Sequence, residues 1–367
     1  MKKAIFEKMN QNGWNLSVPL IQGGMGVGVS LSNLAGAVAK EGGMGVISTA
    51  QIGYDDPDFA GNEQECNLKA IASHIKKTKE IAKGKGMVAV NVMVALQHYK
   101  EHVLAAVKAG ADAIICGAGL PMDLPALVKG SAAKIAPIVS SRKAAALILK
   151  SWMKKYQVLP DFIVIEGPKA GGHLGFSAED AEELTQETFA EEVKQIVEEK
   201  AKYEETCEKK IPVFLAGGIW DHKDVLFAKS LGVDGVQAAT RFVATEECDA
   251  SEAFKMAYVN AKAEDVKIIK SPVGMPGRAL NNKMIQDLQF GNHKVKRCYH
   301  CIKNCNPAEI PYCITNALVN AVKGNLDEGL IFCGENVSKI TKIETVHDVV
   351  EDRGCKFFCV FEIKKTF

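Results

Sequence analysis

The sequence predicts an α/β fold of the (β/α)8 TIM barrel class, with a C-terminal extension that is helical and rich in cysteine. Short apolar runs alternate with amphipathic stretches, and this alternation implies a parallel sheet. The runs are apolar throughout, so both faces of each strand are expected to be buried. Eight strand–helix units precede residue 241, which is the number that a TIM barrel requires.

The expected strands, in chain order, are Val18–Ile21, Gly45–Ser48, Met87–Asn91, Ala113–Cys116, Ala136–Ser140, Phe162–Ile165, Val213–Ala216 and Gly235–Ala238. The helices expected between them include Leu31–Lys40, Asn67–Ala82, Glu101–Ala109, Arg142–Lys154, Phe189–Tyr203 and Lys223–Ser230. A doubly wound sheet is the rival fold, and it normally opens with a spaced dinucleotide fingerprint. The glycines of Gly23–Gly28 do not have that spacing, so the barrel is favoured.

We expect three regions along the chain. Residues 1–241 form the barrel, and residues 242–290 form a helical segment that packs on it. This second region contains the loop Ser271–Arg278, which prolines and glycines stiffen and turn. Residues 291–367 form the cysteine-rich extension, which includes an apolar run at 357–361.

Composition excludes several classes of protein. The chain has 367 residues, 47% of them hydrophobic, with a net charge of +1. Such a chain buries a core and has no overall field that attracts nucleic acid or an anionic membrane. No stretch reaches the roughly 18 apolar residues of a membrane helix, and the first residues lack a signal peptide's apolar stretch. We therefore expect a cytoplasmic protein with a small-molecule substrate and mostly reduced thiols.

The most informative segment is Ile165–Gly175, which follows a predicted buried strand. Active sites of such barrels lie at the carboxyl ends of the strands. The pair Gly171 and Gly172 allows the backbone to approach a ligand closely. His173 follows directly and titrates near neutral pH, so it is the candidate catalytic residue.

Two further glycine-rich strand ends predict a phosphorylated ligand. Gly217 and Gly218 follow the seventh strand, and Gln237 to Thr240 follow the eighth. This is the usual phosphate site of the fold, where bare amides hold the oxygens. Ala238 lies between the two polar residues, and the Thr240 hydroxyl adds a donor.

Polar side chains at other strand ends indicate the rest of the ligand. Gln22, Asn91 and Gln237 carry amides that both donate and accept, as the edge of a flat heterocycle requires. Glu166 is suited to a ribityl hydroxyl. The alternative is that each group satisfies backbone atoms at the barrel mouth. Cys116, at the end of the fourth strand, is a further candidate for the pocket wall.

Taken together, these motifs resemble the nitronate monooxygenase family, formerly the 2-nitropropane dioxygenases, which is related to the FMN-dependent enoyl-ACP reductases. The matching segments are Pro19–Met25, Asn91–Met93, Glu166–Gly167, Ala170–His173, Ala216–Ile219, Gly235–Gln237 and Thr240–Arg241. The resemblance implies noncovalent FMN and a catalytic or substrate-binding role for His173. It also implies FMN contacts at Gly24, Met25, Asn91, Glu166, Gly171, Gly172, Gly217, Gly218, Gln237 and Thr240. Gly23, in the same strand end as Gly24, is a further candidate FMN contact.

Three functions stay open at this point. A nitronate monooxygenase oxidises a nitronate to a carbonyl compound and nitrite with oxygen. An enoyl-thioester reductase uses NAD(P)H as co-substrate. A flavin protein that is a redox sensor rather than an enzyme is the third. A barrel with an open mouth and an additional lid often dimerises, so a homodimer is a second alternative beside the monomer.

Two features depart from the resemblance. Lys169 occupies a position where an acidic residue is expected in many relatives, and it either favours an anionic substrate or points to solvent. The extension carries four cysteines within sixteen residues: Cys298, Cys301, Cys305 and Cys313. Such a set is able to bind zinc or an iron–sulfur cluster, although it matches neither standard spacing. The alternative is free thiols in a lid over the barrel mouth.

Arg278 is predicted either to bind a substrate anion or to form a structural ion pair.

Overall fold

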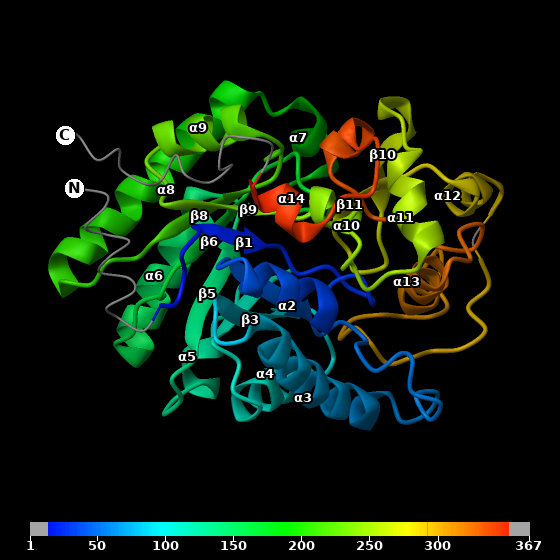
Figure 1. The fold of residues 1–367 in the computed structure, drawn as a ribbon, viewed down its shortest axis with the longest axis horizontal. Coiled ribbons are helices and arrows are strands. Elements are labelled where there is room, and N and C mark those ends of the chain that lie inside the picture. Colours follow the sequence, from blue (N-terminus) through cyan, green and yellow to red (C-terminus); the bar gives the residue numbers. More distant parts are fainter. Residues whose placement is uncertain (1–13, 292, 352–367) are drawn as a thin grey trace.

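The predicted barrel is confirmed by the computed structural model, which describes residues 14–291 and 293–351 (Figure 1). Its eight parallel strands close in the order β1-β2-β3-β4-β5-β6-β8-β9. They are β1 (Leu20–Gln22), β2 (Met44–Ser48), β3 (Met87–Met93), β4 (Ala113–Gly117), β5 (Lys134–Val139), β6 (Ile163–Glu166), β8 (Val213–Ala216) and β9 (Gly235–Ala238). The apolar run predicted at 357–361 lies outside the described residues.

Side chains fill the barrel interior, as they do in this fold. Trp14 enters at the amino-terminal end and contacts Phe162, with ring centroids 5.2 Å apart, and Phe214. These aromatic rings close that end of the barrel.

Helices cover the outside of the barrel and leave its mouth free (Figure 1). They are α2 (Ser32–Lys40), α3 (Glu63–Ala82), α4 (Tyr99–Lys108), α5 (Leu124–Leu127), α6 (Arg142–Tyr156), α7 (Ala178–Glu183), α8 (Gln186–Cys207) and α9 (His222–Ser230). Side-chain caps fix the residues at which several of these helices begin. Ser141 accepts a hydrogen bond from the amide of Ala144 at the start of α6, and Asp221 forms a capping box with Asp224 at the start of α9. Their apolar faces pack on the outside of the strands in two clusters of buried side chains.

Most of the chain beyond the barrel lies beside its mouth, at the right of Figure 1, whereas α14 (Val346–Glu351) packs on the outside of the barrel in the same apolar cluster as Leu34 and Val38 of α2. Its elements are α10 (Thr240–Val243), α11 (Glu252–Val259), η1 (Ala263–Asp265), β10 (Val266–Lys270), β11 (Pro276–Leu280), α12 (Lys283–Asp287), η2 (Leu288–Phe290), α13 (Ile314–Lys323), η3 (Glu335–Lys339) and α14 (Val346–Glu351). No helix among the described residues is both long and apolar enough to span a membrane.

The segment after the barrel is less helical than predicted. β10 and β11 form an antiparallel hairpin, and the two-residue strand β7 (Gly172–His173) extends it through pairs with Gly277 and Arg278. The loop predicted at 271–278 is thus only partly a loop. Pro276 is the first residue of β11, the middle strand of this small sheet, and the first position of a strand is one that tolerates proline. The hairpin consequently holds the candidate histidine by backbone pairing.

Candidate active site

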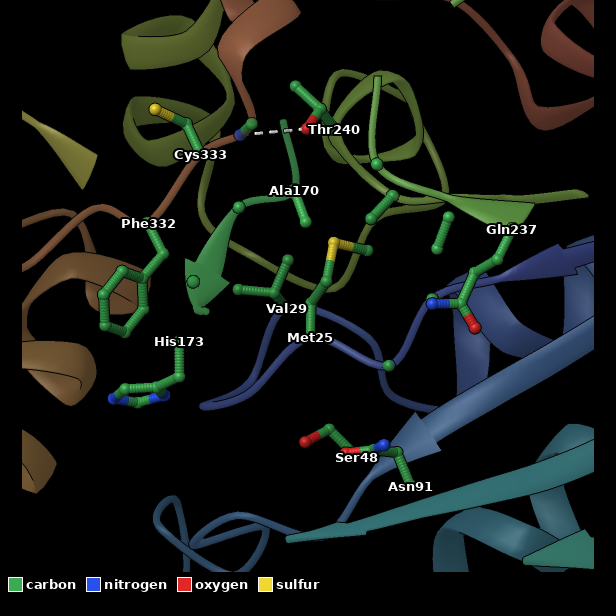
Figure 2. Close-up of a pocket in the computed structure, with 18 of the residues that line it drawn as sticks. Met25, Val29, Ser48, Asn91, Ala170, His173, Gln237, Thr240, Phe332 and Cys333 are labelled. Atoms are coloured by element: carbon green, nitrogen blue, oxygen red, sulfur yellow. Dashed lines mark hydrogen bonds between the residues drawn. The ribbon is translucent and has the colours of Figure 1, made fainter. Parts of the chain in front are cut away.

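A cavity of about 230 Å³ opens at the carboxyl ends of the strands (Figure 2). All but two of the residues predicted for the site line it. They are Gly23, Gly24, Met25, Asn91, Glu166, Gly171, Gly172, His173, Gly217, Gly218, Gln237, Ala238 and Thr240. The structure therefore brings these residues together around one cavity.

Gln22 is one of the two exceptions, and it belongs to the scaffold. Its side chain is fully buried; Nε2 donates to the carbonyls of Gly23 and Val46, and Oε1 accepts from the amide of Val46 at 3.0 Å. The amide ties β1 to β2 and is saturated. The alternative weighed for it, satisfaction of backbone groups at the mouth, is the correct one.

Cys116 is the second exception. Side chains alternate along a strand, so Ile115 and Gly117 face the cavity while Cys116 faces outward. It is fully buried beside Tyr99 of α4, and this burial raises the pKa of its thiol to about 12. Cys116 is therefore a packing residue rather than a cofactor contact.

The glycine-rich strand ends form a cradle on one wall. Gly217 and Gly218 have φ angles of 87° and 81°, which favour glycine. A Cβ at Gly218 would lie 3.3 Å from that of Lys169, so the two loops approach closely. Thr240 contributes a hydroxyl, which accepts from the amide of Gly334 at 3.1 Å (Figure 2). This donor-rich turn suits a phosphate.

Amide and carboxyl groups lie around the rest of the cavity. Asn91 and Gln237 come from β3 and β9, and both lie across the cavity from His173 (Figure 2). Burial raises the pKa of Glu166 to about 7, while a hydrogen bond from the amide of Gly175, at 3.2 Å, lowers it. The carboxyl group is therefore protonated more readily than a free one, and in that form it donates as well as accepts. This mixed set fits the edge of a heterocycle and its hydroxylated side chain.

His173 lies on the wall opposite the amides (Figure 2). Its Nε2 hydrogen-bonds the hydroxyl of Ser271 at 2.7 Å, and its ring meets Phe332 edge-on, with centroids 4.9 Å apart. Burial lowers the pKa of His173 to about 4. The imidazole is consequently neutral at pH 7, with Nδ1 as the nitrogen available to a ligand.

Several residues of the site were missed from the sequence because they come from the two regions beyond the barrel, residues 242–290 and the extension. Phe254, Tyr258, Leu318, Leu330 and Phe332 form an apolar wall of the cavity. Cys333 and Gly334 pack directly on the histidine loop: a Cβ on Gly171 would lie 2.5 Å from the Cys333 carbonyl carbon. The extension therefore completes the site, a role that spacing along the chain does not indicate.

Arg278 is buried and does not face the cavity. Its guanidinium donates to the carbonyls of Pro168, Ala170 and Ala181, at 2.5, 2.8 and 3.2 Å. Neither an ion pair nor a substrate contact is its role; it clamps the loop that carries His173. Lys169, by contrast, lines the cavity and pairs with Glu335 at 3.2 Å, with both side chains nearly half exposed.

The four clustered cysteines lie apart from this cavity. Cys298, Cys301, Cys305 and Cys313 are free thiols around a second, smaller cavity. Among the described residues, no group of three or more His, Cys, Asp or Glu side chains is arranged to hold a metal ion.

The low pKa of His173 predicts a pH-dependent stability. The folded-state pKa of about 4 lies below the ordinary 6.5, so the fold prefers the neutral imidazole. This preference contributes fully to the free energy of unfolding above pH 6.5. This contribution, about 3 kcal/mol, is lost as pH falls from 6.5 to 4. The measurement is denaturant unfolding of cofactor-free protein and of His173→Gln across this range. We expect the free energy of unfolding of the parent to fall toward that of His173→Gln as the pH is lowered. If the two free energies changed in parallel with pH, His173 would not be the cause.

Comparison with known proteins agrees with this geometry. The family model described as nitronate monooxygenase matches residues 10–353. A probable nitronate monooxygenase of Staphylococcus aureus (strain Newman) is 26% identical, over 75% of this chain and 78% of the relative. The one of strain JH9 is 34% identical over 35% and 34%.

Two solved structures share the fold. FabK from Thermotoga maritima superposes with a TM-score of 0.72 at 23% identity, over 96% of this chain and 95% of that one. Nitroalkane oxidase from Streptomyces ansochromogenes superposes with a TM-score of 0.67 at 17% identity, over 91% and 94%. At these identities the likeness concerns the barrel and its extension.

Proposed function

The chain belongs to the nitronate monooxygenase family and is a flavin-dependent oxidoreductase, and on this premise we propose that it oxidises alkyl nitronates to carbonyl compounds and nitrite with FMN and oxygen. FMN, when bound, supplies the electron acceptor for the substrate and passes the electrons to oxygen.

The residues of the main cavity fit FMN. The turns at Gly217, Gly218 and Thr240 would hold the phosphate, and Glu166 a ribityl hydroxyl. Asn91 and Gln237 would meet the edge of the ring system. Gly172 leaves space beside His173, since a Cβ there would meet nothing within 4 Å.

The observation that carries the proposal is the placement of His173 on the cavity wall, where Ser271 holds Nε2 and Phe332 packs against the ring, so that Nδ1 is left for a ligand. A hydrogen bond from a neutral donor orients an anion without the cost of burying a second charge. A base whose conjugate acid has a pKa of about 4 is poorly matched to removing a carbon-bound proton at pH 7. This combination favours a substrate that enters already ionised, as a nitronate does.

A second candidate is reduction of an enoyl thioester with NAD(P)H. The apolar wall of Leu318, Leu330 and Phe332 favours it, because such a wall buries an acyl chain. The same wall also accommodates the alkyl group of a nitronate. The two reactions therefore share a site and differ in their co-substrate.

One experiment separates them. Protein reconstituted with FMN is mixed with an alkyl nitronate while oxygen and nitrite are followed. We expect oxygen consumption matched by nitrite, and no bleaching of the flavin by NADH in anaerobic solution. Rapid bleaching, with NADH oxidation driven by an enoyl thioester and no reaction with nitronate, would replace the first function by the second. Failure to bind FMN would overturn both.

A further inference from the structure

The cysteines of the extension converge on a place that the flavin reaction does not use. Cys298, Cys301, Cys305 and Cys313 all line one cavity of about 160 Å³. The loop is attached to the barrel there: the amide of Gln97 donates to the carbonyl of Cys301 at 3.0 Å, and Ile302 forms a bridge with Leu96.

The four cysteines lie around this cavity, and none of them is bonded to another. Cys298 Sγ also lies 3.9 Å from Nδ1 of His300, which lines the same cavity. The side chains able to bind a metal therefore gather at one place in the extension.

Backbone amides point at two of these sulfurs. The amide of His300 donates to Cys298 Sγ at 3.4 Å, and those of Thr315 and Asn316 to Cys313. Amide–sulfur hydrogen bonds stabilise thiolates and are one of the means by which a protein tunes a cluster. A protonated thiol, being a weak acceptor, benefits little from them.

The size of the cavity favours a cluster over a single ion. Zinc–sulfur bonds of about 2.3 Å would bring four sulfurs within about 4 Å of each other. A cubane core keeps its sulfur ligands farther apart, because iron and sulfide lie between them. The cavity is also far larger than one ion requires.

We propose that Cys298, Cys301, Cys305 and Cys313 bind an iron–sulfur cluster of the [4Fe–4S] type. This site packs behind the wall of the flavin cavity, since Cys301 belongs to the same apolar cluster as Leu318 and Phe332. The assignment is independent of which substrate the flavin oxidises.

The test uses the full-length protein, reconstituted under anaerobic conditions with ferrous iron, sulfide and a thiol reductant. We expect about four iron and about four acid-labile sulfide per chain, and a low-temperature paramagnetic signal after reduction with dithionite. Cys298→Ser and Cys305→Ser, at partly exposed positions, should each lose at least half of the iron and the signal. Cys207→Ser, on α8, is the matched control and should keep both.

FMN content serves as the check on folding. Variants that bind FMN normally but lose iron and sulfide support the proposal. About one equivalent of zinc, or of iron without sulfide, would overturn it in favour of a single-ion site. Protein that holds neither, with all four thiols open to alkylation before and after reconstitution, would overturn metal binding altogether.

Discussion

Replacing His173 by glutamine is expected to lower kcat/KM for an alkyl nitronate by about 10²–10⁴-fold. The imidazole is held by Ser271 on one nitrogen and by Phe332 against its edge, so its position is fixed before substrate arrives. Glutamine is neutral and of similar length but lacks the planar ring that this packing orients. The measurement is steady-state oxygen consumption with FMN-saturated protein.

The control for this change is His222→Gln, at the start of α9, which does not line the cavity. It should retain the parent kcat/KM. The ratio of nitronate to neutral nitroalkane turnover supplies a second readout, since a weakly basic imidazole predicts a ratio of ten or more. Equal rates with both substrates would show that His173 removes the proton itself, against our proposal.

Arg278→Met is expected to lower the free energy of unfolding by about 3–5 kcal/mol, because three buried carbonyls lose a charged donor. The loop from Pro168 to Ala170 is also freed, although the arginine touches no substrate. We therefore expect weaker FMN binding and a lower kcat. Chemical denaturation and flavin titration measure the two effects.

Arg278→Lys tests whether the clamp needs the forked guanidinium. Lysine keeps the charge but lacks the planar, forked set of donors with which arginine binds three carbonyls. Arg278→Lys should therefore be more stable than Arg278→Met and less stable than the parent. If Arg278→Met retained full FMN affinity and kcat while losing stability, Arg278 would be a purely structural residue. A positioning role requires all three quantities to change together.

The barrel was predictable because each strand is a short apolar run bounded by turn residues, and the carboxyl ends of parallel strands meet. Gly217, Gly218 and Thr240 were placed together by that reasoning alone. Gln22 and Cys116 failed for different reasons. An amide at a strand end satisfies backbone as readily as a ligand, and a one-residue step along a strand reverses which face a side chain takes.

The sequence predicted that regions beyond the barrel exist, but it did not indicate that they contribute to the site. Nothing in the spacing of Ser271 or Phe332 indicates that either contacts His173, because the contacts span long separations in the chain. The hairpin of β10 and β11 was hidden by its turn, whose prolines and glycines suggested a longer loop. Pairing with a two-residue strand leaves no periodic signal at all.

The active-site cavity is closed by residues that leave the ribosome late. The barrel strands end at Ala238, whereas the amides of Gly334 and Glu335 dock on Thr240 and Lys169. A nascent chain with a finished barrel thus still exposes the cradle and the histidine loop. Cofactor retention and the docking of the last hundred or so residues are consequently linked, since whatever fills the cradle stabilises the docked form. Flavin supply during synthesis would then influence how much newly made chain escapes proteolysis.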